Sequence, residues 1–300
     1  MVASESANEE RAAFGRLLAE LRPRLHRYCA RMMGSVIDGE DVVQEAFTKA
    51  LAAFQGMSVL ENPEAWLFRI AHHAALDLLR RRARERALVS SEETSTMADP
   101  STTDERLATA ASLHAFMRLP VAQRSCVILK DVLGYSLQEI EDITRASIPA
   151  IKASLHRGRA ELREIAAEPE DTALPSLGPR ERALLVAYAD RFNARDFDAV
   201  RDLLAEEVRL EVVSRTTLEG KAEVAGTYFV NYGATYDWHF VPGLVEGRPA
   251  MLVWNPLELS QMPCYFVLLE WTAGLLSLAR DFRHATYVTE GAAMIRLPAD

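Results

Sequence analysis

The chain is poor in cysteine and contains no long apolar run. Its three cysteines, Cys29, Cys126 and Cys264, are odd in number and widely separated, which argues against a disulfide framework or a zinc site and fits a reducing compartment. No run of about 18 apolar residues occurs, so no membrane span is expected. The N-terminal stretch is polar and lacks the apolar core of a signal peptide. We therefore expect a cytoplasmic protein without a metal or another cofactor.

The net charge of −9 is unevenly distributed over the 300 residues. Residues 1–86 carry +1, residues 87–108 carry −4, residues 109–166 carry +2 and residues 167–300 carry −8. A weakly basic segment binds DNA poorly by itself, because affinity depends on neutralising phosphates. If residues 1–166 contact DNA, we expect a larger complex to supply most of the affinity. The length predicts two or three domains.

The stretch 135–163 predicts two short helices joined by a tight corner. Ser136 can cap the first helix, and Glu139 completes a capping box. Arg145-Ala146 forms the corner, and Ser147 caps the second helix. The order of helix, corner and helix is that of a helix-turn-helix.

The second of these helices has an apolar side and a basic side. Ile151, Leu155 and Leu162 recur at helical spacing and predict the buried side. The basic stripe beside them consists of Lys152, His156, Arg159 and Arg163. Amphipathic helix pairs with exposed cations are also common in proteins that do not bind DNA, so this stretch alone leaves both interpretations open.

Three helices are expected within residues 9–86. The first covers 9–33, with a break or a new first turn at Pro23. The second begins at Asp38 as its cap, and a loop over 55–61 separates it from a third helix that Asn62 caps. The second helix leaves outward a polar, acidic surface, which is either a solvated face or a docking surface for a basic partner: Asp38, Asp41, Gln44, Glu45 and Thr48.

The third helix presents one side that mixes an aromatic ring with charges. It ends in a cluster of arginines, which can simply complement the helix dipole. Aromatic rings interleaved with cations also suit the unstacked bases and phosphates of single-stranded DNA. The side consists of Trp66, Arg69, His73, Asp77, Arg80 and Arg81.

Two segments resemble one bacterial family. LHRYCARMMGSVIDGEDVVQEAFTKAL, followed by NPEAWLFRIAHHAALDLLRRRAR, resembles the second conserved region of extracytoplasmic-function sigma factors. Residues 112–165 resemble the fourth region of the same group. Two matches in the right order, at about the right separation, are far more specific than either alone. The resemblance implies a promoter-specificity subunit that binds the RNA polymerase core and promoter DNA, and that is not itself an enzyme.

The resemblance also implies roles for individual residues. Docking on the clamp helices of the largest polymerase subunit falls to Asp38, Asp41, Gln44 and Glu45, and the subunit bearing the flap is a second expected contact. Opening and holding the minus-10 element falls to the loop 55–62 and to Trp66, Arg69, His73, Asp77, Arg80 and Arg81. Contact with the minus-35 element falls to Ser147, Lys152, Ser154, His156, Arg157 and Arg159. The group usually has Asn where His73 stands and often Arg where Ser154 stands, which leaves the promoter preference open.

The last third of the chain has a different pattern. We expect a helix over 180–204, a strand over 208–213, a short helix over 220–232 and strands over 238–241, 251–254, 264–271 and 277–282. The run FNARDFDAVRDLLAEEVRLEV resembles SnoaL-like domains of the nuclear transport factor two-like superfamily, which implies an α+β cone. A regulatory role, with a small-molecule ligand as one option, is the favoured expectation for this part.

A cone of this kind encloses a pocket in the resembled domains. Its candidate lining is Tyr228, Asp237, Trp238, His239 and Trp254. Asp237 and His239 stand two residues apart, so on a strand they share a face and can support acid–base chemistry. Aromatic residues in a small cone more often fill its core, and that alternative is preferred.

The expected fold class is multidomain: two all-α domains, the second with a helix-turn-helix, followed by the α+β cone. The expected boundaries are 1–86, a flexible acidic linker 87–108, 109–167, a linker 168–179, and 180–300. Two other functions stay open. One is a ligand-responsive DNA-binding regulator that acts without the polymerase core, and the other is a SnoaL-like enzyme domain fused to a DNA-binding segment.

Overall fold

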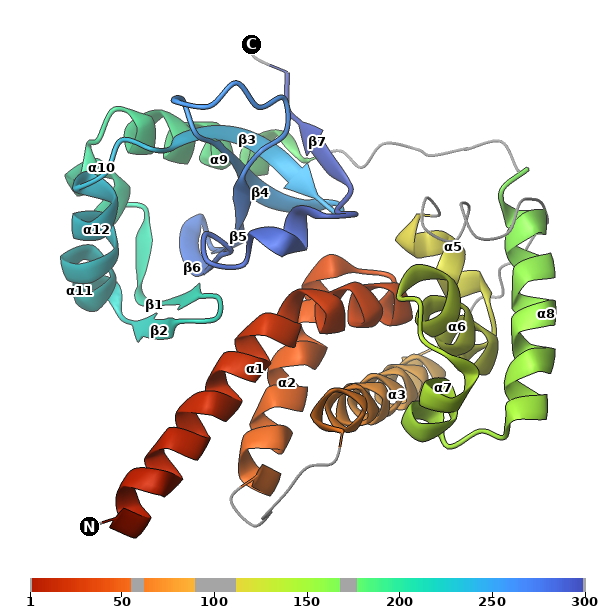
Figure 1. Ribbon diagram of the computed structural model, residues 1–300. Helices are drawn as coiled ribbons and strands as arrows, with labels where there is room; N and C mark the ends of the chain where they lie inside the picture. The colour runs from red at the N-terminus through yellow and green to blue at the C-terminus, as the bar shows by residue number, and fades with distance from the viewer. Residues whose placement is uncertain (1, 55–61, 90–111, 168–176, 299–300) are drawn as a thin grey trace. The chain divides into compact units, whose positions relative to one another are not determined.

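Two units make up the chain, and they differ in secondary structure. The computed structural model describes residues 2–54, 62–89, 112–167 and 177–298, and divides the chain into residues 1–171 and 172–300 (Figure 1). The described part of the first unit is helical, whereas the second combines helices with a seven-stranded sheet. Within the described ranges, no helix is both long and apolar enough to cross a bilayer. The expected loop 55–61 and most of both expected linkers lie outside these ranges.

The helices of the first unit share one apolar core. Phe68 and Tyr135, which lie 67 positions apart, meet edge-on there with ring centroids 5.2 Å apart. The two segments expected to read DNA therefore pack against each other. The elements are α1 (Val2–Met33), α2 (Val36–Phe54), α3 (Pro63–Val89), α5 (Leu113–Arg118), α6 (Val121–Val127), the π-helical turn η1 (Ile128–Val132), α7 (Leu137–Thr144) and α8 (Ile148–Ile165).

The break expected at Pro23 is absent, and this prediction is wrong. α1 runs through Pro23 without interruption. Proline removes one backbone hydrogen bond from a helix interior. Leu21 and Leu25 on either side of it are buried, so packing of the apolar side holds the helix together across the proline.

The cap of α2 also differs from the expectation. Ser35, not Asp38, occupies the cap, and its Oγ accepts a hydrogen bond of 3.1 Å from the Asp38 N–H. Asp38 is inside the first turn and is buried, because its carboxylate pairs with Arg82 of α3 at 2.6 Å. Asp38 therefore does not belong to the outward acidic surface of α2.

The second unit places helices against one face of a mixed sheet. The sheet order is β2-β1-β6-β5-β4-β3-β7, in which only β1 and β6 pair in parallel. This is the α+β architecture expected for 180–300. The elements are α9 (Pro179–Asn193), α10 (Phe197–Arg201), β1 (Leu204–Val212), β2 (Thr216–Glu219), α11 (Lys221–Val224), η2 (Ala225–Phe229), α12 (Val230–Gly233), β3 (His239–Val245), β4 (Arg248–Trp254), β5 (Tyr265–Thr272), β6 (Leu275–Asp281), the turn η3 (Thr286–Thr289) and β7 (Met294–Arg296).

The helix expected over 180–204 is in fact three elements. α9 ends at Asn193, and Arg195 adopts a left-handed conformation with φ of 60°. Asp196 then caps α10 through a 3.1 Å bond from the Ala199 N–H, and β1 begins at Leu204. The apolar spacing that continues beyond Asn193 belongs to a second helix, which explains why the periodicity alone gave too long an element. The short helix over 220–232 is confirmed as α11, η2 and α12, and the five expected strands lie largely within β1, β3, β4, β5 and β6, whereas β2 and β7 were not expected.

Candidate nucleic-acid interface

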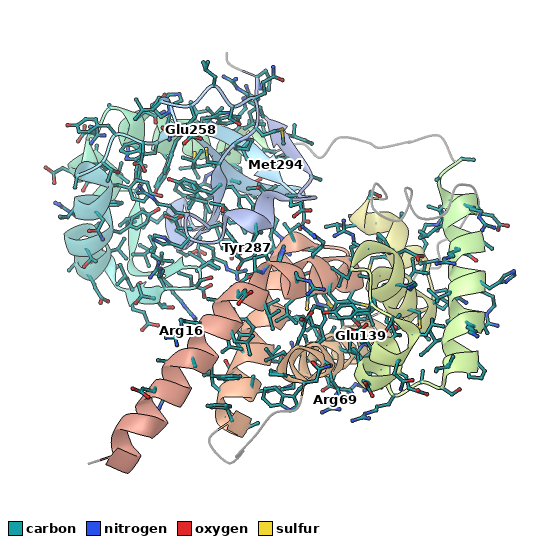
Figure 2. The ribbon with its side chains drawn as sticks, in the orientation of Figure 1. Arg16, Arg69, Glu139, Glu258, Tyr287 and Met294 are labelled. Atoms are coloured by element: carbon teal, nitrogen blue, oxygen red, sulfur yellow. The ribbon has the colours of Figure 1, made fainter. Side chains whose placement is uncertain are left out.

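The capping box at the start of α7 is confirmed. The Glu139 N–H donates to Ser136 Oγ at 3.2 Å, and the Ser136 N–H donates to Glu139 Oε2 at 2.7 Å (Glu139 is labelled in Figure 2). These hydrogen bonds lower the pKa of Glu139. α7 then buries Ile140 and Ile143, so a local signal and an apolar side together position this helix.

The corner between α7 and α8 is made as expected. Arg145 ends α7 in a left-handed conformation with φ of 62°. Ser147 occupies the cap position of α8, but its side chain makes no capping hydrogen bond and is exposed. α8 buries Ile151 and Leu155 against α6 and presents its opposite side outward.

A basic groove runs along α8. Its volume is about 400 Å³, and two leucines form its apolar floor. Lys152, His156 and Arg159, all expected to contact DNA, lie in it, while Arg157 is exposed outside it. The groove is lined by Lys130, Leu137, Lys152, Leu155, His156, Arg159 and Arg163.

Two of the expected minus-35 residues are not available in the way the sequence suggested. Ser154, for which the resemblance implies a minus-35 contact, is only 8% exposed and so is not available at the surface. Arg159 forms a two-point ion pair with Asp131, with Nε to Oδ2 at 2.9 Å and Nη2 to Oδ1 at 2.5 Å. Asp131 was not recognised from the sequence, because 28 residues separate it from Arg159.

α3 begins as predicted and carries the expected mixed side. The Ala65 N–H donates to Asn62 Oδ1 at 3.0 Å, and Pro63 takes the first helical position. Trp66 and Arg69 are half-buried, and the Trp66 ring lies 6.2 Å from that of Phe14. The other four members of the side are exposed: His73, Asp77, Arg80 and Arg81. Asp77 pairs with Arg80 at 3.2 Å, which reduces the positive charge of this side.

The neighbouring His72 points the other way, into the core. Its Nδ1 shares a 2.6 Å hydrogen bond with the Tyr28 hydroxyl of α1. Burial, with smaller contributions from His73 and Arg80, lowers the pKa of His72 to about 4. His72 was not singled out from the sequence, although its position one residue from the outward side of a helix indicates an inward side chain.

The outward side of α2 is smaller than expected. Asp41 is exposed, and Gln44 and Glu45 are partly exposed. Glu45 pairs with Lys49 one turn further on, at 2.7 Å. Three of the four expected polymerase-binding residues therefore remain on one accessible side, and Asp38 lies behind them.

The structure does not assemble the expected pocket of the second unit. Tyr228 and Trp238 belong to the aromatic core around Phe192, with ring centroids 6.4 and 5.3 Å from it. Asp237 precedes β3 and pairs with Arg283 at 2.7 Å. Burial raises the pKa of Asp237, but its hydrogen bonds with Thr235 and Arg283 outweigh this effect and lower it. Trp254 is half-buried at the end of β4.

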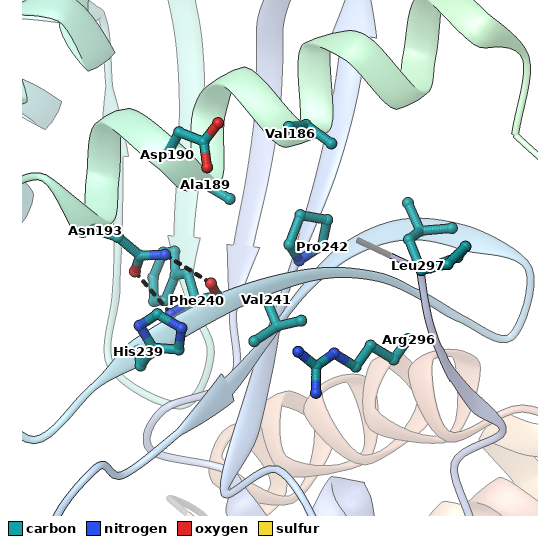
Figure 3. A pocket seen from close by; sticks show the side chains of 11 residues that line it. Val186, Ala189, Asp190, Asn193, His239, Phe240, Val241, Pro242, Arg296 and Leu297 are labelled. Atoms are coloured by element: carbon teal, nitrogen blue, oxygen red, sulfur yellow. Dashed lines mark hydrogen bonds between the residues drawn. The ribbon is translucent and has the colours of Figure 1, made fainter. Parts of the chain in front are cut away.

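His239 instead lines a hollow between α9 and β3 (Figure 3). The hollow has a volume of about 360 Å³ and includes Asp190 and Arg296 in its lining. Asn193 closes one end by donating to the Phe240 carbonyl at 2.8 Å and accepting from the Phe240 N–H at 2.9 Å. Asp237 is not part of this lining, so the acid–base pair suggested by the spacing of Asp237 and His239 does not form.

A buried carboxylate at the end of β6 was missed by the sequence analysis. Asp281 is 1% exposed and accepts hydrogen bonds of 2.8 Å from both Tyr228 and Tyr232. The Arg283 N–H donates to its other oxygen at 2.8 Å. Burial raises the pKa of Asp281. Among the described side chains, no group of three His, Cys, Asp or Glu residues is arranged to hold a metal ion.

Comparisons with known proteins agree with the two-region organisation of the first unit. The family description "Sigma-70 region 2" matches residues 17–85, and "Sigma-70, region 4" matches residues 112–162. The ECF RNA polymerase sigma factor SigG of Mycobacterium tuberculosis is 27% identical, over 94% of this chain and 84% of its own length. The RNA polymerase sigma factor CarQ of Myxococcus xanthus is 32% identical, over 53% of this chain and 91% of its own.

A solved structure is also similar to part of this chain. An NTF-2 like protein of unknown function from Burkholderia xenovorans LB400 is 16% identical, with a TM-score of 0.28, over 34% of this chain and 80% of that chain. The match to SigG extends over almost the whole chain, so both units have an equivalent in that relative.

Proposed function

This chain belongs to the extracytoplasmic-function group of RNA polymerase sigma factors, and on this basis we propose a binding role for each of three surfaces. As a member of this family it directs the polymerase core to promoters. We assign the basic groove of α8 to duplex DNA at the minus-35 element. We assign the mixed side of α3 to the opened minus-10 element and the outward side of α2 to the polymerase.

The assignment of α8 is supported by its charge and shape. Lys152 and His156 are exposed on one side of a helix that is thin enough for the major groove, and Ser147 and Arg157 flank them. The apolar side of the same helix is buried, so the cations are held on a rigid element. Because Ser154 is buried, we do not assign it a direct contact with DNA.

The assignment of α3 rests on residue types suited to single strands. The half-buried Trp66 offers a ring beside Arg69, and Arg80 and Arg81 add exposed cations further along the same side. Stacking of bases on aromatic rings and neutralisation of phosphates are the two contributions that single-strand binding needs. His73 stands between them as an exposed hydrogen-bonding group.

The proposed polymerase-binding surface of α2 consists of three of the four residues expected from the sequence. Asp41, Gln44 and Glu45 face outward and suit a basic partner surface, for which we propose the clamp helices of the largest subunit. Asp38 is buried and is not assigned to the docking surface. Its ion pair with Arg82 connects α2 to α3.

We assign a regulatory rather than an enzymatic role to the second unit. Its candidate acid and imidazole, Asp237 and His239, lie in different local environments, so this particular pair does not support acid–base catalysis. The net charge of residues 167–300 is −8, which is opposite in sign to the charge of the α8 groove. Removal of residues 172–300 should therefore change promoter binding or transcription.

The observation that carries the proposal is the groove of α8, which collects cations on the exposed side of a capped helix-turn-helix. The test is selection from a randomised duplex library by the full chain bound to bacterial core polymerase, followed by run-off transcription from the selected duplex. We expect one enriched pair of elements and a discrete transcript. Lys152→Ala should weaken transcription about tenfold. Asp142→Asn, a change at an exposed residue of α7, should not reduce it. Absence of any enriched element would overturn the proposal.

A further inference from the structure

The groove of α8 contains one cation that is held differently from the others. Arg159 is clamped by both oxygens of Asp131, whose side chain is fully buried, while the Arg159 side chain remains 28% exposed. Lys152 and His156 are exposed residues with no comparable clamp among the described contacts. The buried carboxylate requires a cationic partner, so the position of Arg159 is strongly determined.

The local backbone explains why Asp131 reaches this position. Residues Ile128–Val132 form a π-helical turn at the end of α6. Such turns insert one extra residue and re-aim the side chains around them, and they are frequent at functional sites. Here the turn directs Asp131 inward beneath Arg159, and places Lys130 in the lining of the groove, where its Nζ donates to the Tyr135 carbonyl at 3.1 Å.

We propose that Arg159 contacts a phosphate of the minus-35 duplex and that Asp131 is the residue that positions it. This inference rests on the proposed function of α8. A guanidinium has five N–H donors, and Asp131 engages the edge made by Nε and Nη2. The ion pair with Asp131 involves Nε and Nη2 and does not by itself prevent an end-on contact with a base, so the salt dependence of binding is what identifies a phosphate contact. A phosphate contact requires only a fixed cation at the wall of the groove.

Holding the side chain in advance makes the contact stronger. An arginine that is ordered only on binding loses rotamer freedom at that moment, and this loss lowers the affinity. With Asp131 in place, the ordering has already occurred in the free protein. Asp131 thus carries a negative charge next to DNA and nevertheless increases the affinity for it.

This consequence gives a test in which position and charge predict opposite signs. Asp131→Asn removes one negative charge next to the groove, so the net charge there becomes more positive by one. If charge alone matters, the full chain bound to core polymerase should hold its selected promoter duplex more tightly. If position matters, affinity should fall about five- to tenfold in spite of the lost negative charge. Asp142→Asn is the matched control, since it makes the same charge change at an exposed residue outside the groove.

Salt dependence separates a phosphate contact from general loss of structure. We expect the slope of log affinity against log KCl, between about 50 and 200 mM, to become shallower by about 0.9 for Asp131→Asn. Arg159→Lys, which keeps the charge and loses the fork, should show the same change. If Asp131→Asn unfolds, as a urea titration would show, Arg159→Lys decides the question alone.

The outcomes distinguish this inference from the function on which it rests. If the wild-type complex selects no promoter, the proposed function fails. If it selects one, and both variants bind with the affinity and salt slope of Asp142→Asn, the function stands and the role of Asp131 is wrong. Weaker binding with an unchanged salt slope would also overturn the phosphate contact.

Discussion

The Tyr28 hydroxyl and His72 Nδ1 share a 2.6 Å hydrogen bond in the interior of the first unit, where neither ring is open to solvent. This bond joins α1 to α3 directly behind His73, which is exposed on the side assigned to the minus-10 element. Loss of this hydrogen bond, for example by protonation of His72, should therefore change how α3 presents His73.

Acid should destabilise the first unit through His72. Its pKa is about 4 in the folded chain, below the ordinary 6.5, so the unfolded chain binds the proton more readily. The stability contribution is present above pH 6.5 and is lost as the pH falls towards 4, by up to about 3 kcal/mol. Urea titrations at a series of pH values should show this loss. His72→Asn, which keeps a hydrogen-bonding group and does not titrate, should reduce the slope between these values, and an unchanged slope would contradict the assignment.

Substitution of Arg82 should destabilise the joint between α2 and α3. Arg82→Ala removes the cation that faces the buried Asp38 carboxylate at 2.6 Å, and we expect a loss of about 2 kcal/mol in the free energy of unfolding. Arg81→Ala, on the exposed neighbour, should change stability by less than about 0.5 kcal/mol. Thermal and urea unfolding of both variants provide the measurement. Equal effects would show that the pair contributes no specific stability.

Two glycines should respond in opposite directions to alanine. A Cβ at Gly39 of α2 would lie 2.5 Å from the backbone nitrogen of Ala30, so Gly39→Ala must push α1 and α2 apart. We expect a loss of about 3 kcal/mol. Gly15 of α1 has nothing within 4 Å of such a Cβ, so Gly15→Ala should stabilise the helix by about 0.5 to 1 kcal/mol. Denaturant midpoints measure both. Tolerance of alanine at Gly39 would be incompatible with this close helix contact.

The buried carboxylate of the second unit should depend on its tyrosines. Tyr232→Phe removes the hydroxyl that donates to Asp281 at 2.8 Å and lies 3.1 Å from the Tyr265 hydroxyl. We expect a loss of about 1 to 3 kcal/mol, because Asp281 is then less well hydrogen-bonded in the interior. Tyr236→Phe is the control, since Tyr236 is 72% exposed. Differential unfolding of the full chain should show the change in the transition of the second unit, and none for the control.

Local signals in the sequence were sufficient for several elements. Ser136 with Glu139 predicted the start of α7, and Asn62 with Pro63 predicted the start of α3. Both are short-range hydrogen-bonding patterns, so their information is contained in three or four neighbouring residues. The exposed side of α3 followed from helical spacing in the same way. Errors arose where packing outweighed such signals, as at Pro23, or where two elements continued one periodicity, as beyond Asn193.

By itself, the sequence determined the order of the helices, the helix-turn-helix, the family and the α+β character of the last third, because these depend on periodicity, caps and motif order. Only the tertiary structure decided which polar groups are available. Asp38 and Ser154 turned out to be buried, and Arg159 turned out to be paired with Asp131. The separation of Asp237 from His239 was decided there as well. Each of these outcomes depends on a partner that is distant in the chain, and periodicity carries no information about such a partner.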